Sequence, residues 1–350
     1  MNLTASPAWG DAGLTASRYL VLLLEILESR GIDATAVLAG SGLSRTALES
    51  AGSYVSASEL QKLLANAERL SNDRLLGMAL GKQLNLSAHG TIGFTGMTAA
   101  NARDAIAVAV EDFALVTALV QLHFAEGATQ SRITIQPAPG LDPASERFVV
   151  QTLISSIDLM GTFLLGQYQP SFRIDLTWPQ EPGLQACLGA AISSLTFDQP
   201  QHCIHLSSHL LDIPFALADS RAHAQGRQRC QRELQQLQRQ QGHAARLYQY
   251  LLQQAEQAPS IEDIASALNV SSRTVHRQLE AEGVGFRELL NEARMTRARH
   301  YLLREGCGIT ETAHRLGYQD SANFTRAFKR HMGMTPSAYL RQHDSTDPSP

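Results

Sequence analysis

The stretch GYQDSANFTRAFKRHMGMTP, from Gly317 to Pro336, decides how the end of this chain folds. Phe324 and Phe328 are four residues apart, so they lie on one helical face and predict that this face is buried. The other side carries Ser, Asn, Thr and Arg side chains without paired carboxylates. Such a surface suits a polyanion or simply water, and the neighbouring sequence has to distinguish the two.

The stretch belongs to an internal repeat with a spacing near 48 residues. Both copies predict a short helix with a central Ala, a turn and a second helix, which is the pattern of a helix-turn-helix, because the small Ala lets the second helix cross closely. An all-α bundle that binds nothing is the alternative, and the presence of two copies disfavours it. The matching residues are Ile261, Ala265, Leu268, Val270, Val275, Arg277 and Leu279 in the first copy, and Ile309, Ala313, Leu316, Tyr318, Phe324, Arg326 and Phe328 in the second.

Local signals mark the ends of these helices. Ser260 followed by Asp263 predicts a capping box at the start of the first copy. Asn269 and Gly317 stand where the two turns accept a left-handed backbone. The N-caps of the two second helices are predicted at Ser271 or Ser272, and at Asp320 or Ser321.

A helix predicted over residues 286–303 joins the two copies. Its 18 residues span about 27 Å at 1.5 Å per residue, and adjacent major-groove turns on one face of B-DNA lie about 34 Å apart. The helix can therefore hold two recognition helices at nearly one-turn separation. Arg294, Arg297 and Arg299 on it are candidates for phosphate contacts, although basic residues on a helix often serve solubility alone.

The length and charge of the chain favour two unlike domains. The 350 residues exceed the usual size of one domain. Residues 243–341 carry 13 Lys and Arg against 10 Asp and Glu, whereas the remainder carries 16 against 23, which gives the net charge of −4. A mildly basic end on an acidic body is compatible with a local nucleic-acid contact.

Cysteine usage and hydropathy indicate the compartment. Four cysteines without a CxxC pair favour reduced thiols in a cytoplasm over a disulfide framework or a zinc site. The N-terminus lacks the pattern of a secretory signal. The apolar segment 149–165 is interrupted by polar residues, which predicts a core or interface helix rather than a membrane span.

The first 221 residues mix helical and strand patterns. Without a regular βαβ rhythm they predict an α+β domain. Residues 222–243 are rich in Gln and Arg and predict a linker, helical from 229 to 240, with Leu234 and Leu237 as a narrow contact seam. This seam and the 149–165 helix are candidate dimer contacts, with core packing as the alternative. Helices are predicted at 16–29, 57–70, 74–84, 102–119 and 145–165, and strands at 120–124, 131–136, 172–178 and 203–206.

No catalytic constellation emerges from the sequence. His202, Cys203, His205 and His209 come nearest to a metal cluster, but neighbours on a strand point to opposite faces, and a second ligand group is not evident. Nucleophile-elbow, P-loop and dinucleotide-binding patterns are absent from the sequence. The cysteines also lack the basic setting of reactive thiols. We therefore expect no enzyme activity, no cofactor and no metal.

The segment that begins SIEDIASALNVSSRTVHRQL at Ser260 and ends SAYLR at Arg341 resembles the DNA-binding domain of AraC/XylS-type transcription regulators. Its second half fits the pattern GYxDxxxFxRAFKRxxGxTPxxY. More loosely, the segments GIDATAVLAGSGL, LLGMALGKQLNLSAHGTIGF and LTFDQPQHCIHL resemble an arabinose-binding-type N-terminal effector domain. That domain occurs in the branch with ornithine-utilisation, quorum-sensing and virulence regulators.

The resemblance implies DNA-contacting residues at matching positions of the two recognition helices. Arg pairs with guanine and Asn with adenine, whereas Ser, Thr and helix N-termini more often contact phosphate. Arg277 and Arg326 occupy equivalent repeat positions and are the foremost candidates, with a salt bridge to a neighbouring carboxylate as the alternative role. The full set is Ser272, Arg273, Thr274, His276, Arg277, Ser321, Asn323, Thr325, Arg326 and Lys329.

The chain departs from the family pattern in the first copy. Leu279 and Glu280 replace a frequent Phe-Lys pair, and Asn269 replaces a usual glycine. The first change removes an expected phosphate contact, so the first motif is the weaker candidate for reading sequence.

Together these features predict a cytoplasmic transcription regulator that binds promoter DNA through two successive major grooves and responds to a small-molecule effector. The predicted fold is an α+β effector-binding and dimerisation domain (1–221), a linker (222–243), an all-α domain with two helix-turn-helix motifs joined by a long helix (244–342), and a disordered tail (343–350). A homodimer is expected, and RNA polymerase is a further candidate partner. The alternative is a ligand-independent DNA-binding protein whose N-terminal domain only oligomerises.

Overall fold

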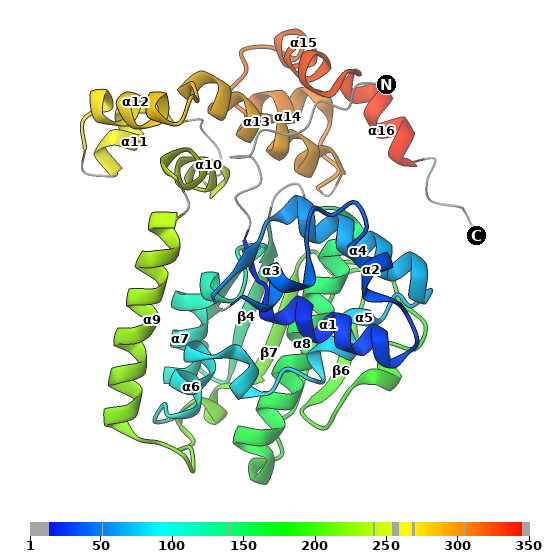
Figure 1. Cartoon of the computed structure of the whole chain (residues 1–350), viewed down its shortest axis with the longest axis vertical. Helices are drawn as coiled ribbons and strands as arrows, with labels where there is room; N and C mark the ends of the chain where they lie inside the picture. The colour runs from blue at the N-terminus through cyan, green and yellow to red at the C-terminus, as the bar shows by residue number, and fades with distance from the viewer. Residues whose placement is uncertain are drawn as a thin grey trace. The chain divides into compact units, whose positions relative to one another are not determined.

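The computed structural model of the chain describes residues 14–50, 52–138, 141–240, 242–253, 259–267, 270–303 and 305–344. The chain divides into two compact units, one from Gly13 to Leu237 and one that contains the residues from Gln238 onward. Figure 1 shows the helices and strands of both units. The predicted disordered tail, 343–350, starts within the last helix, which ends at Asp344, and its other residues lie outside the described part.

The N-terminal unit is an α+β domain. The helix predicted at 102–119 is too long, because the observed helix α7 (Ala102–Asp112) ends at Asp112 and a 3₁₀ turn follows. The short elements α6 (Thr91–Met97) and β6 (Ile192–Thr196) were not predicted. The elements are β1 (Thr15–Ala16), α1 (Arg18–Ser29), α2 (Ala34–Leu38), α3 (Arg45–Glu49), β2 (Tyr54–Val55), α4 (Ala57–Ser71), α5 (Leu76–Gly81), α6 (Thr91–Met97), α7 (Ala102–Asp112), β3 (Val120–Ala125), β4 (Gln130–Pro137), α8 (Pro143–Leu165), β5 (Phe172–Asp175), β6 (Ile192–Thr196), β7 (His202–Ser207) and α9 (Ser220–Gln240).

A five-stranded sheet with the order β3-β4-β7-β5-β6 forms one layer of this unit, and only its β5–β6 pair is parallel. Ile204 of β7 pairs with Ile133 of β4 on one side and with Ile174 of β5 on the other. All three isoleucines are buried. Because directly paired residues of neighbouring strands lie on the same face, the three side chains form a row within the main core.

Helix α8 is the central helix of the unit. By length and composition the stretch Pro143–Tyr168 could cross a membrane, but half of its apolar 18-residue window is buried inside the unit. Its polar residues bond to neighbouring elements: Ser155 Oγ donates to the Met78 carbonyl at 3.0 Å, and Asp158 accepts the backbone N–H of Ile192 at 3.1 Å. Glycine allows α5 to approach closely, since a Cβ at Gly77 would lie 2.4 Å from the backbone oxygen of Phe148. The structure thus favours the predicted core helix.

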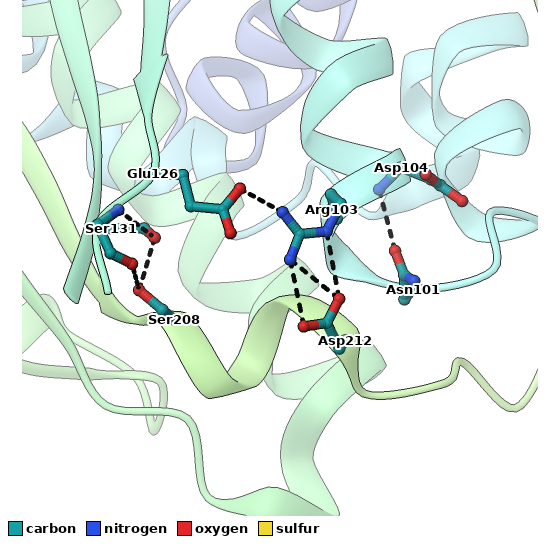
Figure 2. A network of polar contacts seen from close by, with 8 residues as sticks. Asn101, Arg103, Asp104, Glu126, Ser131, Ser208 and Asp212 are labelled. Atoms are coloured by element: carbon teal, nitrogen blue, oxygen red, sulfur yellow. Dashed lines mark hydrogen bonds and ion pairs between the residues drawn. The ribbon is translucent and has the colours of Figure 1, made fainter. Parts of the chain in front are cut away.

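Helix α7 is held to the sheet and to the segment after β7 by a polar network. Arg103 on α7 forms ion pairs with Glu126 at the β3–β4 turn and with Asp212, whose Oδ1 lies 3.0 Å from Nη2 (Figure 2). Ser131 and Ser208 join β4 to the same segment at 2.8 Å. These contacts fix the start of α7 relative to the sheet.

Helix α9 begins at Ser220, earlier than the predicted 229, and packs on α6 and α7, as the yellow-green helix in Figure 1 shows. Cys230 and Leu237 are buried against Val108 of α7. Arg227 forms ion pairs with Glu111 and with Asp112, the latter at 3.1 Å. The predicted leucine seam therefore packs within its own unit, which favours core packing over a dimer contact.

The C-terminal unit is helical in its described residues. Its elements are α10 (His243–Gln253), α11 (Ile261–Ala267), α12 (Ser272–Ala281), α13 (Phe286–Leu303), α14 (Ile309–Arg315), α15 (Ser321–Met332) and α16 (Pro336–Asp344). The joining helix has the bounds predicted from sequence. It serves two separate cores: Leu289 and Ala293 pack with α10, α11 and α12, whereas Met295 and Ala298 pack with α14, α15 and α16.

Candidate nucleic-acid interface and ligand cavity

Helix α12 presents one apolar and one cationic side. Ser271 is its N-cap, since its Oγ accepts the Thr274 backbone N–H at 3.1 Å. Val275 and Leu279 are buried in the first core. The opposite side of α12 therefore faces away from this core.

The predicted DNA-contacting residues of α12 all lie outside the core. Arg273, His276 and Arg277 are exposed, and Ser272 and Thr274 are half-buried. Within the described residues, the two arginines form no hydrogen bond or ion pair. The cationic groups are thus available for an external partner. The prediction for Asn269 lies outside the described residues.

Helix α15 is anchored by aromatic side chains. Asp320 is its N-cap and accepts the Asn323 backbone N–H at 2.6 Å. Phe324 and Phe328 are fully buried, with ring centroids 5.6 Å apart in an edge-to-face arrangement. Tyr339 of α16 contacts the Phe328 ring at 5.5 Å. This confirms that the quoted aromatic pair faces the core.

The polar side of α15 contains a short chain of hydrogen bonds. Asn323 Nδ2 donates to Asp320 Oδ2 at 2.8 Å, and Arg326 Nη2 donates to Asn323 Oδ1 at 2.6 Å. Arg326 is exposed, and within the described residues it forms no ion pair. The structure therefore connects Arg326 to an amide rather than to the carboxylate of the alternative prediction. Lys329 is also exposed, and Ser321 and Thr325 are half-buried.

Arg294, Arg297 and Arg299 of the joining helix contact aromatic side chains of their own unit. The Arg294 guanidinium lies over the Tyr318 ring at 5.3 Å. Arg297 is buried and stacks on Tyr301. Arg299 Nε donates to the hydroxyl of Tyr339 at 3.0 Å. Arg297 is thus committed to packing, and a phosphate contact of the partly exposed Arg294 and Arg299 stays a prediction.

Glu282, which sequence reasoning missed, holds α10 to the end of α12. Its carboxylate accepts the backbone N–H of Ala244 at 2.9 Å and bonds to the His243 ring at 3.0 Å. Burial opposes ionisation, but the hydrogen bonds from Ala244 and His243 lower the pKa of Glu282 overall. No local sequence pattern predicts this contact, because His243 of α10 lies about 40 residues before Glu282 in the chain.

The N-terminal unit contains a cavity of about 240 Å³ beside the sheet, and this cavity is partly open to the surface. Its walls come from α1, α6, α7, α8 and the inner face of the sheet. None of its described lining residues is Asp, Glu, Lys or Arg. An apolar cavity of about 150 Å³ already holds benzene. The space is therefore large enough for a small organic molecule.

Tyr19, His89 and Ser156 form a hydrogen-bonded chain in the cavity wall. Ser156 Oγ donates to the Leu84 carbonyl at 3.1 Å and so accepts from His89 Nε2 at 3.0 Å, which leaves His89 Nδ1 to accept from the Tyr19 hydroxyl at 3.0 Å. Burial and the nearby charge of Arg18 lower the pKa of His89 to about 4, and burial raises the pKa of Tyr19. Both side chains are therefore neutral near pH 7.

The histidines considered as metal ligands have other partners. His202 is buried against Glu146 at 3.2 Å, and His205 pairs with Asp175 at 2.7 Å. In the part of the chain that the structure describes, no group of three or more His, Cys, Asp or Glu side chains could hold a metal ion. Burial raises the pKa of the Cys203 thiol, which disfavours its reactive thiolate form.

The comparisons with known proteins place the chain in a family. Residues 31–215 match the arabinose-binding domain of AraC transcription regulators, and residues 264–342 match a helix-turn-helix domain. The chain belongs to the AraC family of transcription regulators. It joins an arabinose-binding-type α+β domain to a helical DNA-binding domain, and the family is one of regulators rather than enzymes.

Individual relatives match either most of the chain or only its C-terminal part. The chain is 27% identical over 328 residues to the ornithine utilization regulator of Pseudomonas aeruginosa, covering 94% of this chain and 96% of that protein. It is 36% identical over 100 residues to the urease operon transcriptional activator of Escherichia coli, covering 28% and 34%. The crystal structure of the regulator CdpR from Pseudomonas aeruginosa matches at 23% identity and a TM-score of 0.45, covering 93% of this chain and 98% of that one.

Proposed function

We propose that this regulator reads duplex DNA in two blocks, one through α12 and one through α15, as two helix-turn-helix motifs joined by α13. The observation that carries the proposal is that each helix buries its apolar face in a separate core and leaves an arginine, Arg277 or Arg326, exposed at the equivalent repeat position. Each bidentate pair of an arginine with guanine contributes about 1–3 kcal/mol of discrimination.

The remaining polar residues have supporting roles in this proposal. Asn323 is suited to adenine through its amide, and its bond to Arg326 orients the guanidinium before DNA arrives. The helix N-termini and hydroxyls set the register on phosphate. The assigned contacts are Ser272, Arg273, Thr274, His276 and Arg277 in the first block, and Ser321, Asn323, Thr325, Arg326 and Lys329 in the second.

We further propose that residues 1–221 bind an effector and dimerise, that residues 222–243 carry the signal, and that residues 244–342 bind promoter DNA in the cytoplasm. The cavity of the N-terminal unit supports an effector role, because a domain that only oligomerises has no need of an internal space. Ligand control requires that the effector bind two states of the protein with different affinity.

Selection of random duplex DNA by the full-length protein tests the reading of sequence. We expect two enriched blocks about one helical turn apart. Arg277→Ala should reduce the base preference in one block, and Arg326→Ala should reduce it in the other. Arg287→Ala is the matched control, since it removes one exposed positive charge at the start of α13 without touching either recognition helix.

Two results would contradict the proposal. Binding without enrichment that falls steeply with salt would mean that the protein contacts only the DNA backbone. An equal loss of base preference in all three variants would mean that net charge, rather than base contact, accounts for the enrichment.

A further inference from the structure

The wall of the cavity contains apolar side chains that remain half-buried inside a folded unit. Ile106, Ala109 and Val110 of α7 line it on one side, and Leu153, Ile157 and Leu164 of α8 line it as well. Each square ångström of apolar surface that a ligand covers contributes about 25 cal/mol. The cavity therefore offers a hydrophobic driving force for binding.

The chemistry of the wall restricts what can fill this space. The described lining residues include no ionised side chain, and the polar groups of Tyr19, His89 and Ser156 already satisfy one another. A zwitterionic amino acid or a sugar would lose its hydration there without receiving matching hydrogen bonds. An uncharged hydrocarbon loses nothing of this kind.

Two wall residues also support α9. Ile92 and Val108 line the cavity and belong to the apolar cluster that contains Cys230 and Leu237 of α9. A Cβ at Gly226 of α9 would lie only 2.4 Å from the Thr95 hydroxyl, so α9 fits closely on α6. A shift of either wall residue thus changes the surface on which α9 rests, and α9 is the helix from which the chain continues into the DNA-binding unit.

We propose that this cavity binds a hydrophobic small molecule through an uncharged hydrocarbon chain, and that α9 responds to occupancy through Ile92 and Val108. The inference rests on the proposed effector function and names the ligand class and the route of the signal.

Thermal unfolding of the full-length protein tests the ligand class. The probes are 1-decanol, L-ornithine and L-arabinose, each at the same concentration. We expect 1-decanol to raise the Tm of the wild type by several degrees and the two polar probes to leave it unchanged. A shift with a polar probe and none with 1-decanol would overturn the inference.

A pair of alanines on α7 supplies matched variants. Ala109→Leu and Ala109→Phe place larger side chains in the cavity, so the apparent affinity for 1-decanol, obtained from the Tm shift, should fall at least tenfold. Ala107→Phe lies on the exposed side of α7 and should leave this affinity unchanged. A cooperative thermal transition of the N-terminal unit without probe shows that each variant is folded. Equal response of the Ala109 and Ala107 variants would mean that the probe binds elsewhere.

The route through α9 is tested by the effect of 1-decanol on DNA affinity. We expect a change of at least fivefold in the wild type that is lost in Leu237→Ala and kept in Gln235→Ala, whose side chain is exposed on the same helix. Stabilisation by 1-decanol with unaltered DNA affinity would overturn the α9 route. A polar metabolite that changes DNA affinity without competing with 1-decanol would leave the effector function standing and overturn this assignment of the cavity.

Discussion

The two units of this protein fill their interiors in different ways. In the C-terminal unit, Phe324 and Phe328 of α15 are fully buried and in edge-to-face contact. In the N-terminal unit, Leu153 and Ile157 of α8 are half-buried beside a cavity of about 240 Å³. A domain that presents a rigid surface to DNA benefits from full packing, whereas a domain that admits a ligand has to leave space.

Removing a core aromatic should produce the largest effect. Phe328→Ala leaves a void beside the rings of Phe324 and Tyr339. It should lower the free energy of unfolding of the C-terminal unit by about 3–5 kcal/mol. Hydrogen exchange of the α15 amides measures this loss. The control Leu303→Ala, at an exposed position of the same unit, should stay within about 0.5 kcal/mol. Similar losses for both would refute the packing contrast.

Acidification should act on the N-terminal unit through His89. Its pKa of about 4 in the folded protein lies below the ordinary 6.5, so the unfolded chain binds the proton first, and stability falls as the pH drops from 6.5 to 4. The total loss from this group is about 3 kcal/mol, and it is complete below pH 4. Urea unfolding of the wild type and of His89→Gln at several pH values measures the difference. Identical pH dependence of the two would exclude the histidine.

Adding volume should separate the two interiors directly. Ala327→Leu forces a larger side chain into the packed core of α15 and should cost about 1–3 kcal/mol. Ala109→Leu extends into the cavity and should leave the free energy of unfolding unchanged or raise it by up to about 1 kcal/mol. Denaturant unfolding reports both values, and a reversed order would mean that the cavity is not open to larger side chains.

Loss of the Glu282 cap should cause the smallest loss of stability among the destabilising changes. Glu282→Gln weakens the hydrogen bonds to Ala244 and His243, and should cost about 0.5–2 kcal/mol at pH 7, as other helix caps do. Because its pKa is lowered in the folded state, the stabilisation is present at neutral pH and disappears as the pH falls through that pKa. A variant as stable as the wild type at pH 7 would mean that the Glu282 carboxylate does not stabilise the start of α10.

The C-terminal helices could be predicted well because their signals are local. The Phe324 and Phe328 pair lies one helical turn apart, Asp320 caps the helix that it precedes, and Gly317 has the φ of +75° that a turn accepts from glycine. The bounds of α13 follow from the same periodicity. The contacts of Arg294, Arg297 and Arg299 could not be predicted, because aromatic partners from other turns of the unit surround them.

The sequence by itself determined the α+β and helical division, the repeat, the capped recognition helices and the membership of the AraC family. Each of these rests on residues within a few turns of one another or on a motif of fixed spacing. Only the tertiary structure decided where the cavity lies, which side chains remain uncharged in it, and that Ile92 and Val108 touch both the cavity and α9. An internal space has no sequence period, since it arises from what distant elements fail to fill when they pack.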